Sequence, residues 1–473
     1  MKLLKTCVLG LSVLLGAVAT LNANEGSLAF VGATIIDGTD NAPLENATLL
    51  ITDGRVRAIG PSQTVTIPDG ARLINVAGRT IIPGLINAHG HVGDTLGLEG
   101  GHYNRDNLLR QLRLYARYGI TTVFSLGGDA EAGFALRNEQ HVPTLDRARL
   151  YVAGSVVSGD TELEIRRQVN ENADLGADFI KVRVDDNLGR TRKMSRELFD
   201  ALVDQAEQRR LPVAVHLYYL DDARYALEAG ADLIAHSIRD AAVGAEFMDQ
   251  MQTTQVCYVP TLTREVSTFV YESEPDFFAD PFFRREVDDQ IVAELLSPER
   301  MSRVRNSESA QAYKAGLEVA MDNLGALHAA GIPVAMGTDS GPPARFQGYF
   351  EHLELSMMVD AGMSPLAAIR AATGVAAQCM GENNIIGTLE PGNWGDLVIL
   401  RDNPANDITI PALSRVSGLP AMKCRGTERA LRYYSGARKL FRRLAGRKLP
   451  CYSAINSRME LSSTLQPFST SCQ

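Results

Sequence analysis

The fold of this chain is decided by the stretch Thr80-Ile81-Ile82-Pro83-Gly84-Leu85-Ile86-Asn87-Ala88-His89-Gly90-His91, in which an apolar run ends in two histidines one residue apart. In a β-strand, side chains two positions apart lie on the same face, so both imidazoles point the same way and can hold one metal ion. Two histidines on a strand are more often solvated or core residues than ligands. Later strands must therefore supply further ligands if this is a metal site.

Further apolar runs along the chain carry residues that can bind a metal at or near their carboxyl ends. Four of the chain's eight histidines lie at such strand ends, and the other four, including His102 and His141, lie in loop-like or helix-like contexts where a solvated surface position is the simpler interpretation. Five such runs in order are a much stronger signal than one. The four runs after His91 are Asp178–Val182 with Lys181, Val213–His216, Leu233–His236 and Pro333–Asp339.

Between these runs the pattern alternates between β-like and helix-like segments. Amphipathic segments at 107–118, 162–175, 195–210 and 221–229 separate the strands, and β-like runs at 121–126, 149–153 and 256–261 complete a set of eight. Eight strands alternating with helices predict a (β/α)8 TIM barrel, with a doubly wound open sheet as the alternative. Active residues of such barrels lie at the carboxyl ends of the strands, where these candidates fall.

The two ends of the chain have a different pattern. Residues 27–82 contain short β-like runs separated by Asp53-Gly54 and Asp69-Gly70, which predicts hairpins in a small antiparallel sheet. Residues 385–400 return to β character and could join that sheet.

Residues 1–23 are typical of a secretory signal peptide. Lys2 and Lys5 precede the apolar run Val8–Val18, which is too short to span a bilayer, and Ala17-Val18-Ala19 offers a cleavage site. We therefore predict an exported protein, periplasmic or secreted, with a retained membrane anchor as the alternative. Of the six cysteines, Cys257 and Cys379 lie in the body of the chain, and no CxxC occurs, so neither a disulfide framework nor a thiolate zinc site is indicated.

The charge of the last segment is inverted relative to the rest. The chain has a net charge of −9, but residues 411–473 hold nine Arg and three Lys against two Glu, which leaves −19 for the remainder. A basic segment can bind nucleic acid or, as an amphipathic helix over 429–447, anionic surfaces. We favour a shifted reading frame or a poorly ordered, lineage-specific tail, and we predict no nucleic-acid partner.

Together these motifs resemble the amidohydrolase superfamily of metal-dependent hydrolases, most of all its branch of imidazolonepropionase-like proteins and zinc prolidases or carboxypeptidases. The resemblance covers roughly residues 27–405 and includes the closing Gly387-Thr388-Leu389-Glu390-Pro391-Gly392 and Gly395-Asp396-Leu397-Val398. It implies a small β-sandwich built from both chain ends beside a metal-bearing barrel. The predicted organisation is a signal peptide at 1–23, β-sandwich parts at 27–82 and 385–410, a barrel at 83–384 and an atypical tail at 411–473.

The resemblance also implies a role for each candidate ligand. His89, His91 and Asp339 would hold one zinc ion, His216 and His236 a second, and Lys181 would bridge the two as its carbamate. A buried neutral amine can add carbon dioxide, and the apolar neighbours of Lys181 disfavour its charged form; the alternative is an ion pair with Asp185. The two ions would activate a bridging hydroxide, and Asp339 would act as general acid and base or as a ligand only.

Two further residues are candidates for binding the substrate. By period-two alternation, Arg183 lies on the face of Lys181 one step nearer the barrel mouth, and Tyr218 is placed likewise after His216. An arginine there could clamp a substrate carboxylate, which would suit a dipeptide or an N-acyl amino acid. The equally weighted alternative is a structural ion pair of Arg183 with Asp185 or Asp186.

We therefore predict an exported binuclear zinc amidohydrolase that acts on a small molecule or dipeptide and that could form a homo-oligomer. A mononuclear deaminase or cyclic-amide hydrolase is the first alternative; it needs no carbamate and usually has a glutamate near the fifth-strand histidine, where this chain has Leu217, Tyr218 and Tyr219. A lactonase, carbamate hydrolase or organophosphate hydrolase on the same centre, and a non-catalytic binding protein, are the others.

Overall fold

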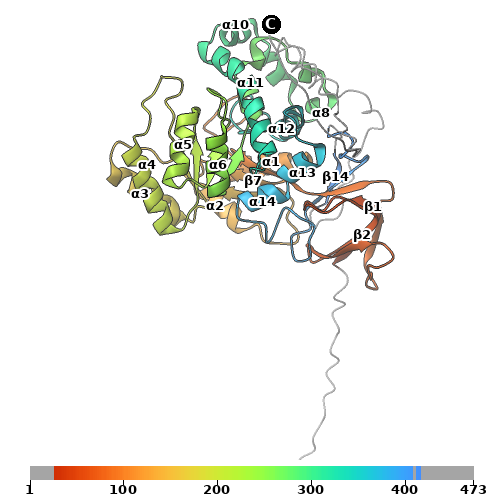
Figure 1. Ribbon diagram of the computed structural model, residues 1–473. Coiled ribbons are helices and arrows are strands. Elements are labelled where there is room, and N and C mark those ends of the chain that lie inside the picture. Colours follow the sequence, from red (N-terminus) through yellow and green to blue (C-terminus); the bar gives the residue numbers. More distant parts are fainter. Residues whose placement is uncertain (1–25, 409–411, 417–473) are drawn as a thin grey trace, which may run out of the picture.

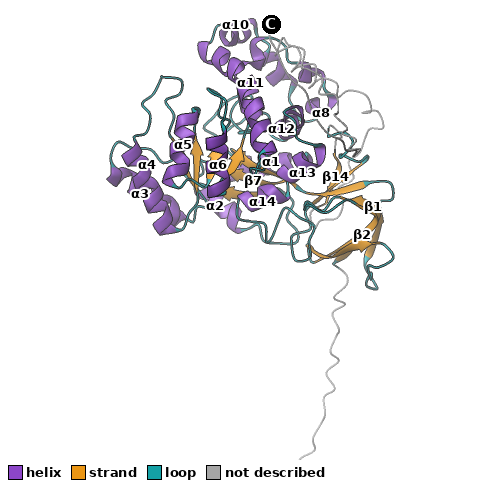
Figure 2. Ribbon diagram, in the orientation of Figure 1, coloured by secondary structure: helices purple, strands orange, loops and turns teal. Residues whose placement is uncertain are grey.

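A computed structural model describes residues 26–408 and 412–416 of the chain (Figure 1). The predicted signal peptide and residues 417–473 of the predicted tail lie outside the described residues. In Figure 2 most helices surround one group of strands, while β1 and β2 belong to a separate sheet at the side of the molecule opposite α3 and α4. The protein is therefore a mixed α/β structure.

The inner strands form two parallel sheets. The first has the order β6-β7-β8 and the second the order β12-β11-β10-β9. Their strands are short and buried, as expected for parallel strands that helices cover. The strand bounds are β6 (Leu85–Gly90), β7 (Ile120–Ser125), β8 (Arg149–Val152), β9 (Ile180–Arg183), β10 (Val213–His216), β11 (Leu233–Ala235) and β12 (Cys257–Val259).

Backbone hydrogen bonds join these sheets to each other and to residues 333–340. Val157 N–H donates to the carbonyl of Lys181, which links the segment after β8 to β9, and Ala335 N–H donates to Tyr258 in β12. On the other side, Ala88 N–H in β6 donates to the carbonyl of Met336. Backbone hydrogen bonds thus join the two sheets to each other and join residues 333–340 to β12 and to β6.

The eighth predicted strand, at 333–339, is not a regular strand. It is held by isolated bridges from Val334 to Tyr258 and from Ser340 to Gly90. Its backbone is irregular because Asp339 has a left-handed conformation, with a φ of +54°. Gly337 packs closely on His89, since a Cβ added to Gly337 would lie 2.9 Å from the His89 Cβ. The prediction of a strand here was right about position and wrong about regularity.

Helices follow the inner strands, and their sequences explain their ends. In α3 the side chain of Thr161 caps the first turn, in a reciprocal box with Glu164, and Gly176 ends the helix with a left-handed φ of 85°. The helices after β6 to β11 are α1 (Arg105–Arg117), α2 (Glu131–Asn138), α3 (Glu162–Leu175), α4 (Arg196–Arg209), α5 (Leu220–Ala229) and α6 (Ala245–Thr254).

A long, mostly helical region follows β12 and covers the top of Figure 1. It comprises α7 (Leu262–Phe269), η1 (Val270–Glu272), η2 (Asp276–Ala279), α8 (Pro281–Arg284), α9 (Asp289–Leu295), α10 (Pro298–Arg305) and α11 (Glu308–Ala329). Three more helices follow residue 340, namely α12 (Tyr349–Asp360), α13 (Pro365–Ala371) and α14 (Gly374–Cys379).

Both ends of the described chain meet in one seven-stranded sheet, of order β14-β13-β5-β1-β2-β3 with β4 on β1. The prediction that residues near 397–400 join the N-terminal strands is confirmed, but the sheet is not purely antiparallel, because β4 and β5 run parallel to β1. Residues of the predicted tail continue it as β14. The bounds are β1 (Ser27–Ile35), β2 (Leu44–Thr52), β3 (Arg55–Pro61), β4 (Arg72–Asn75), β5 (Thr80–Pro83), β13 (Leu397–Leu400) and β14 (Ala412–Val416).

A disulfide joins Cys257 at the start of β12 to Cys379 at the end of α14. The sequence pattern indicated no disulfide framework, and for this pair that interpretation was wrong. The two cysteines are separated by 122 residues, so only the fold brings their Cα atoms to 5.7 Å. Among the described residues, no helix has the length and apolarity that crossing a membrane would need.

Candidate metal centre

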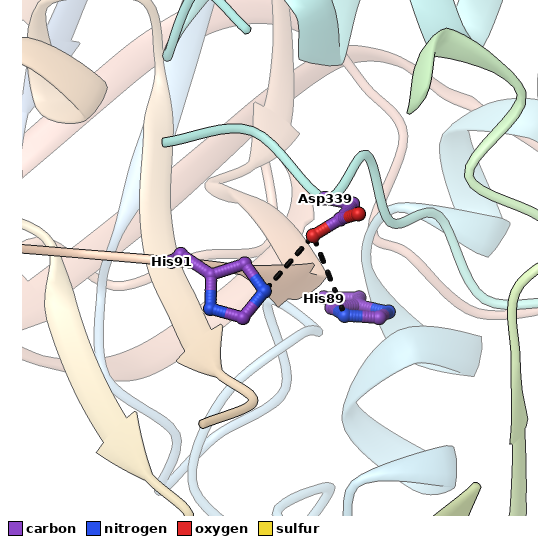
Figure 3. Close-up of side chains that lie close together, drawn as sticks. All are labelled: His89, His91 and Asp339. Carbon is purple, nitrogen blue, oxygen red and sulfur yellow. Dashed lines mark ion pairs between the residues drawn. The ribbon is translucent and has the colours of Figure 1, made fainter. Parts of the chain in front are cut away.

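Three predicted ligands converge where the carboxyl end of β6 meets the segment after residue 336. The Nε2 atoms of His91 and His89 lie 2.9 and 3.8 Å from Oδ1 of Asp339, and Figure 3 shows both imidazoles beside that one carboxylate. One ligand atom from each residue lies within 4.8 Å of the other two. Three such donors at this spacing can hold one metal ion.

The surroundings of His91 leave its Nε2 free to bind a metal. Its Nδ1 lies 2.9 Å from the carbonyl oxygen of Gly127, which can only accept, so Nδ1 carries the hydrogen and Nε2 carries the lone pair. His89 is fully buried, and its Nδ1 has no hydrogen-bond partner among the described residues. The residues present therefore fit a metal ion.

The remaining predicted ligands lie on the other side of His89. The ring of His236 is 4.5 Å from that of His89 and 4.1 Å from that of His216, measured between centroids. His236 Nδ1 lies 2.8 Å from Oγ1 of Thr261, which leaves Nε2 for a ligand. All six predicted ligand residues thus come together, from β6, β9, β10, the end of β11 and the segment after β12.

Lys181 lies between the two groups of ligands. Its Nζ is 3.5 Å from His89 Nε2, and the side chain is buried. Burial, with a smaller contribution from Arg183, lowers the pKa of Lys181 to about 7. In the described part of the chain no carboxylate lies within ion-pair distance of Nζ, so the alternative pairing with Asp185 is not formed.

Burial also dominates the protonation of the histidines. It lowers the pKa of His216 to about 3 and holds the pKa of His89 and His236 well below the usual value. For Asp339, burial alone would raise the pKa, but Arg345 and His91 lower it well below its usual range. The centre therefore offers neutral imidazoles and a carboxylate, which are the forms that bind metal ions.

Asp185 is a buried group at the centre that the sequence suggested only as a partner for other residues. Its Oδ2 lies 3.2 Å from His216 Nε2, and its Oδ1 accepts a 2.7 Å hydrogen bond from Arg183 Nε. Burial would raise the pKa of Asp185, yet these two partners bring it well below the usual value. The ion-pair alternative for Arg183 is therefore the arrangement found, and the same carboxylate lies close to the ligand nitrogen of His216.

Two guanidinium groups that sequence reasoning missed contact the second oxygen of Asp339. Arg345 Nη1 lies 2.5 Å and Arg264 Nε 3.7 Å from Oδ2. The two oxygens of Asp339 thus have different neighbours, with imidazoles at Oδ1 and guanidiniums at Oδ2. Asp339 can bind a metal through one oxygen while the other stays paired.

Tyr218 is also buried, and it packs against another arginine, Arg239. The guanidinium of Arg239 lies 4.7 Å above its ring, and Arg239 pairs with Glu265 at 3.1 Å. Arg264 extends the same cluster, at 3.0 Å from Glu265 and 4.4 Å above the ring of Tyr313. Tyr218 therefore packs in an aromatic and cationic cluster at the edge of the centre.

A cavity of about 100 Å³ lies beside the centre. Arg345 forms part of its wall, with Gly341, Arg110 and Glu286 among the other lining residues. Because Arg345 also contacts Asp339, the cavity is one side chain away from the candidate metal ligands.

Two buried glutamates of α12 support the centre from outside. Glu351 accepts hydrogen bonds from Asn87, Thr338 and Ser340, and Glu354 accepts them from Leu262 and Thr263. The sequence held a signal for both, because carboxylates three apart within an apolar helix must find buried donors. His102 is half-buried and His141 exposed, and neither belongs to the centre.

Comparisons with known proteins identify the family of this chain. The sequence model of the amidohydrolase family matches residues 80–421. Imidazolonepropionase from Geobacillus kaustophilus (strain HTA426) is 23% identical over 76% of this chain and 85% of its own length, and ochratoxinase from Aspergillus niger is 24% identical over 82% and 84%. The solved structure of a Xaa-Pro dipeptidase with bound methionine superposes with a TM-score of 0.67 at 20% identity, over 83% of this chain and 98% of the other.

Proposed function

Because this chain belongs to the amidohydrolase family and is a metal-dependent hydrolase of carbon–nitrogen bonds, we propose that it cleaves the amide bond of a dipeptide or an N-acyl amino acid. The relatives support an amide-bond substrate, and the likeness to a Xaa-Pro dipeptidase supports a dipeptide. The observation that carries the proposal is the buried Lys181 among five other metal-binding side chains.

The proposed centre holds two zinc ions. His89, His91 and Asp339 would bind one, His216 and His236 the other, and the carbamate of Lys181 would bind both. The support for the carbamate is that Lys181 is buried, lacks a carboxylate partner among the described residues and has a pKa near 7, so that much of it is neutral at physiological pH. A neutral amine is the form that adds carbon dioxide. A mononuclear centre without the carbamate would leave this buried lysine without a role.

When bound, the metal ions would polarise the substrate carbonyl and supply hydroxide at neutral pH. Protein side chains would then transfer the proton between the reacting groups. Asp339 Oδ1 faces the imidazoles and is the oxygen placed to exchange a proton with the reacting groups, while its Oδ2 stays with Arg345. The depressed pKa of Asp339 favours its role as a ligand, so any proton that it accepts is passed on readily to the leaving nitrogen.

We assign the binding of the substrate carboxylate to Arg345 rather than to Arg183. Arg183 is already paired with buried Asp185, whereas Arg345 lines the cavity beside the centre and its partner, Asp339, would share its charge with a metal ion. A guanidinium can bind a carboxylate through two parallel hydrogen bonds. Tyr218 would contribute an apolar wall, consistent with its burial.

Two structural parts of the proposal concern architecture and location. We infer a closed (β/α)8 barrel, supported by backbone hydrogen bonds between neighbouring parallel segments, beside a small β-sandwich made from both chain ends. We also infer export to the periplasm or the medium. The Cys257–Cys379 disulfide supports this, because disulfides persist mainly in oxidising compartments.

Elemental analysis of the purified protein tests the metal centre. The unmodified chain is expected to contain about two zinc ions, and Lys181→Ala one or none, because the bridging ligand is lost. Release of free amino acids from dipeptides and N-acyl amino acids should stop when a chelator removes the metal. One metal in both proteins would refute the carbamate and favour the mononuclear deaminase.

Steady-state kinetics of two arginine variants tests the carboxylate site. Arg345→Met should raise KM for a free dipeptide by about 10- to 100-fold, since a charged hydrogen bond contributes about 1.5–3 kcal/mol. The same substrate with an amidated C-terminus should respond much less. If Arg183→Met gives the large effect and Arg345→Met does not, the assignment is wrong.

A further inference from the structure

One buried carboxylate contacts both segments that carry the first group of ligands. Oε1 of Glu351 accepts hydrogen bonds from Asn87 Nδ2 at 2.7 Å, from Thr338 Oγ1 at 2.7 Å and from Ser340 Oγ at 2.6 Å. Asn87 is two residues before His89, and Thr338 and Ser340 flank Asp339 on either side. Its other oxygen accepts the Gly348 N–H at 2.6 Å, which fixes the start of α12.

The hydrogen bonds around Glu351 continue to the ligands themselves. Asn87 Oδ1 accepts the backbone N–H of His89 at 3.0 Å, and the backbone N–H of Asp339 donates to the carbonyl of His89 at 2.7 Å. Thr338 Oγ1 accepts from Asn87 Nδ2 at 2.9 Å and from the Ser340 N–H at 3.1 Å. A single acceptor, Glu351, thus fixes the positions of His89 and Asp339. It does so through the side chains of Asn87, Thr338 and Ser340.

The hydrogen bonds to Glu351 stabilise the backbone on both sides of Asp339. Asp339 has a left-handed backbone, which costs energy for residues with a β-carbon, though less for Asp and Asn than for most, and which the surroundings must stabilise. Glu351, Asn87, Thr338 and Ser340 are all essentially fully buried, so each donor that lost its acceptor would cost about 1–3 kcal/mol. Glu351 therefore supplies an acceptor that neither ligand segment contains.

We propose that Glu351 is a positioning residue that holds His89 and Asp339 in the geometry that binds metal. The inference rests on the proposed function, in which these two residues are ligands. Glu351 touches neither the metal nor the substrate, and it acts through Asn87, Thr338 and Ser340. Partners of this kind typically contribute about 10- to 100-fold to metal affinity.

Glu354 provides a matched control on the same helix. It is as fully buried as Glu351 and accepts hydrogen bonds from Leu262 N–H at 2.8 Å and from Thr263 N–H and Oγ1, both at 2.7 Å. These donors belong to α7, which carries none of the predicted metal ligands. Thr263 Oγ1 also donates to the carbonyl of Thr338, but at the longer distance of 3.3 Å. Glu354→Gln therefore disturbs a comparable buried carboxylate that accepts no hydrogen bond from either ligand segment.

The test is a zinc titration by calorimetry of metal-free protein, for the unmodified chain, Glu351→Gln and Glu354→Gln, with thermal melting of each. Gln places an amide donor among donors, so Glu351→Gln should weaken zinc binding by about 10- to 100-fold, while Glu354→Gln should change it by less than about threefold. Both variants should melt at lower temperature than the unmodified chain.

Two outcomes would overturn the proposal: Glu351→Gln binding zinc as tightly as the unmodified chain, or Glu354→Gln weakening it equally. If Glu351→Gln does not fold, Ser340→Ala takes its place; it removes one donor and should weaken zinc binding by about 3- to 10-fold, and unchanged binding would overturn the proposal. An unmodified chain that binds no zinc would refute the proposed function as well, so the two failures are distinct.

Discussion

The two halves of the candidate centre are organised differently. In the first half, His89 and His91 face one oxygen of Asp339, and a buried hydrogen-bond network holds their backbone. In the second half, the ligand nitrogen of His216 lies 3.2 Å from Asp185, which also pairs with Arg183. In the first half the histidines therefore contact a predicted ligand, Asp339. In the second half His216 contacts Asp185, a carboxylate that is not a predicted ligand.

The two halves differ in which existing side-chain contacts a bound metal would replace. A metal in the first half would replace the 2.9 Å contact between His91 and Asp339 with bonds to both residues, because both are predicted ligands and their donor atoms lie within 4.8 Å of each other. A metal in the second half must replace or share the contact between His216 and Asp185, which are both buried. We therefore expect the first half to bind metal more tightly.

The largest effect is expected from Asp339→Asn, which removes the charge on which the first half converges. The substitution keeps the shape and the left-handed backbone that asparagine tolerates, so the fold should persist. The rate kcat/KM should fall by about 10²- to 10⁴-fold, the usual contribution of a proton-transfer group, and zinc content should fall too. Activity and metal content are measured on the same preparation, and unchanged values for both would contradict the role of Asp339.

A second experiment separates the halves by removing one histidine from each. Zinc titration of the unmodified chain should show a tight and a weaker site. His216→Ala should keep the tight one, whereas His91→Ala should lose it, because only His91 belongs to the preassembled group. If His216→Ala removes the tight site instead, the order proposed for the two halves is reversed.

A smaller effect is expected from Asp185→Asn. It replaces a charge-assisted contact to His216 with a neutral one, so zinc should bind the second half about tenfold more tightly, which corresponds to about 1.4 kcal/mol. Asp186→Asn is the control, since Asp186 accepts a hydrogen bond from Tyr219 and does not contact His216. Weaker zinc binding in Asp185→Asn would identify Asp185 as a metal ligand rather than a competitor.

A last prediction concerns the stability of the fold outside the two halves and its response to pH. Burial raises the pKa of Glu354 from 4.5 to about 8 in the folded protein. Below about pH 4.5 both states hold the proton; between that pH and about 8 only the folded state does, so the free energy of unfolding falls as pH rises. The fall is at most about 1.4 kcal/mol per pH unit.

Chemical denaturation of the unmodified chain and of Glu354→Gln at several pH values between about 5 and 8 measures this response. Glutamine does not titrate, so the variant should lose less stability across the window. Equal slopes for the two proteins would mean that Glu354 stays ionised when the protein folds.

The convergence of the candidate ligands was predictable from sequence because these residues obey a local rule. Each follows a short apolar run, and parallel strands of a barrel present their carboxyl ends on one face, so His216 and His236 could be placed together without coordinates. The seven regular inner strands followed from the same alternation. The irregular backbone of the eighth segment could not be predicted in this way, because the sequence Pro333–Asp339 contains no signal for a left-handed conformation.

The groups that tune the ligands were less predictable because their partners are distant in sequence. Glu351 is 264 residues from Asn87, and Cys257 is 122 residues from Cys379, so no spacing rule joins them. The Arg183–Asp185 pair was foreseen as one of two alternatives because it is local. Which of Arg183 and Arg345 remained available for substrate depended on packing that only the fold determines.

The left-handed backbone at Asp339 also limits how this sequence position can evolve. Asparagine and glycine tolerate such a conformation, whereas valine, isoleucine and threonine resist it because of their branched β-carbons. A descendant that abandoned hydrolysis would therefore be expected to carry asparagine or glycine at 339 and keep its fold. A descendant with a β-branched residue at position 339 would be expected to lose the local backbone conformation as well as the hydrolytic activity.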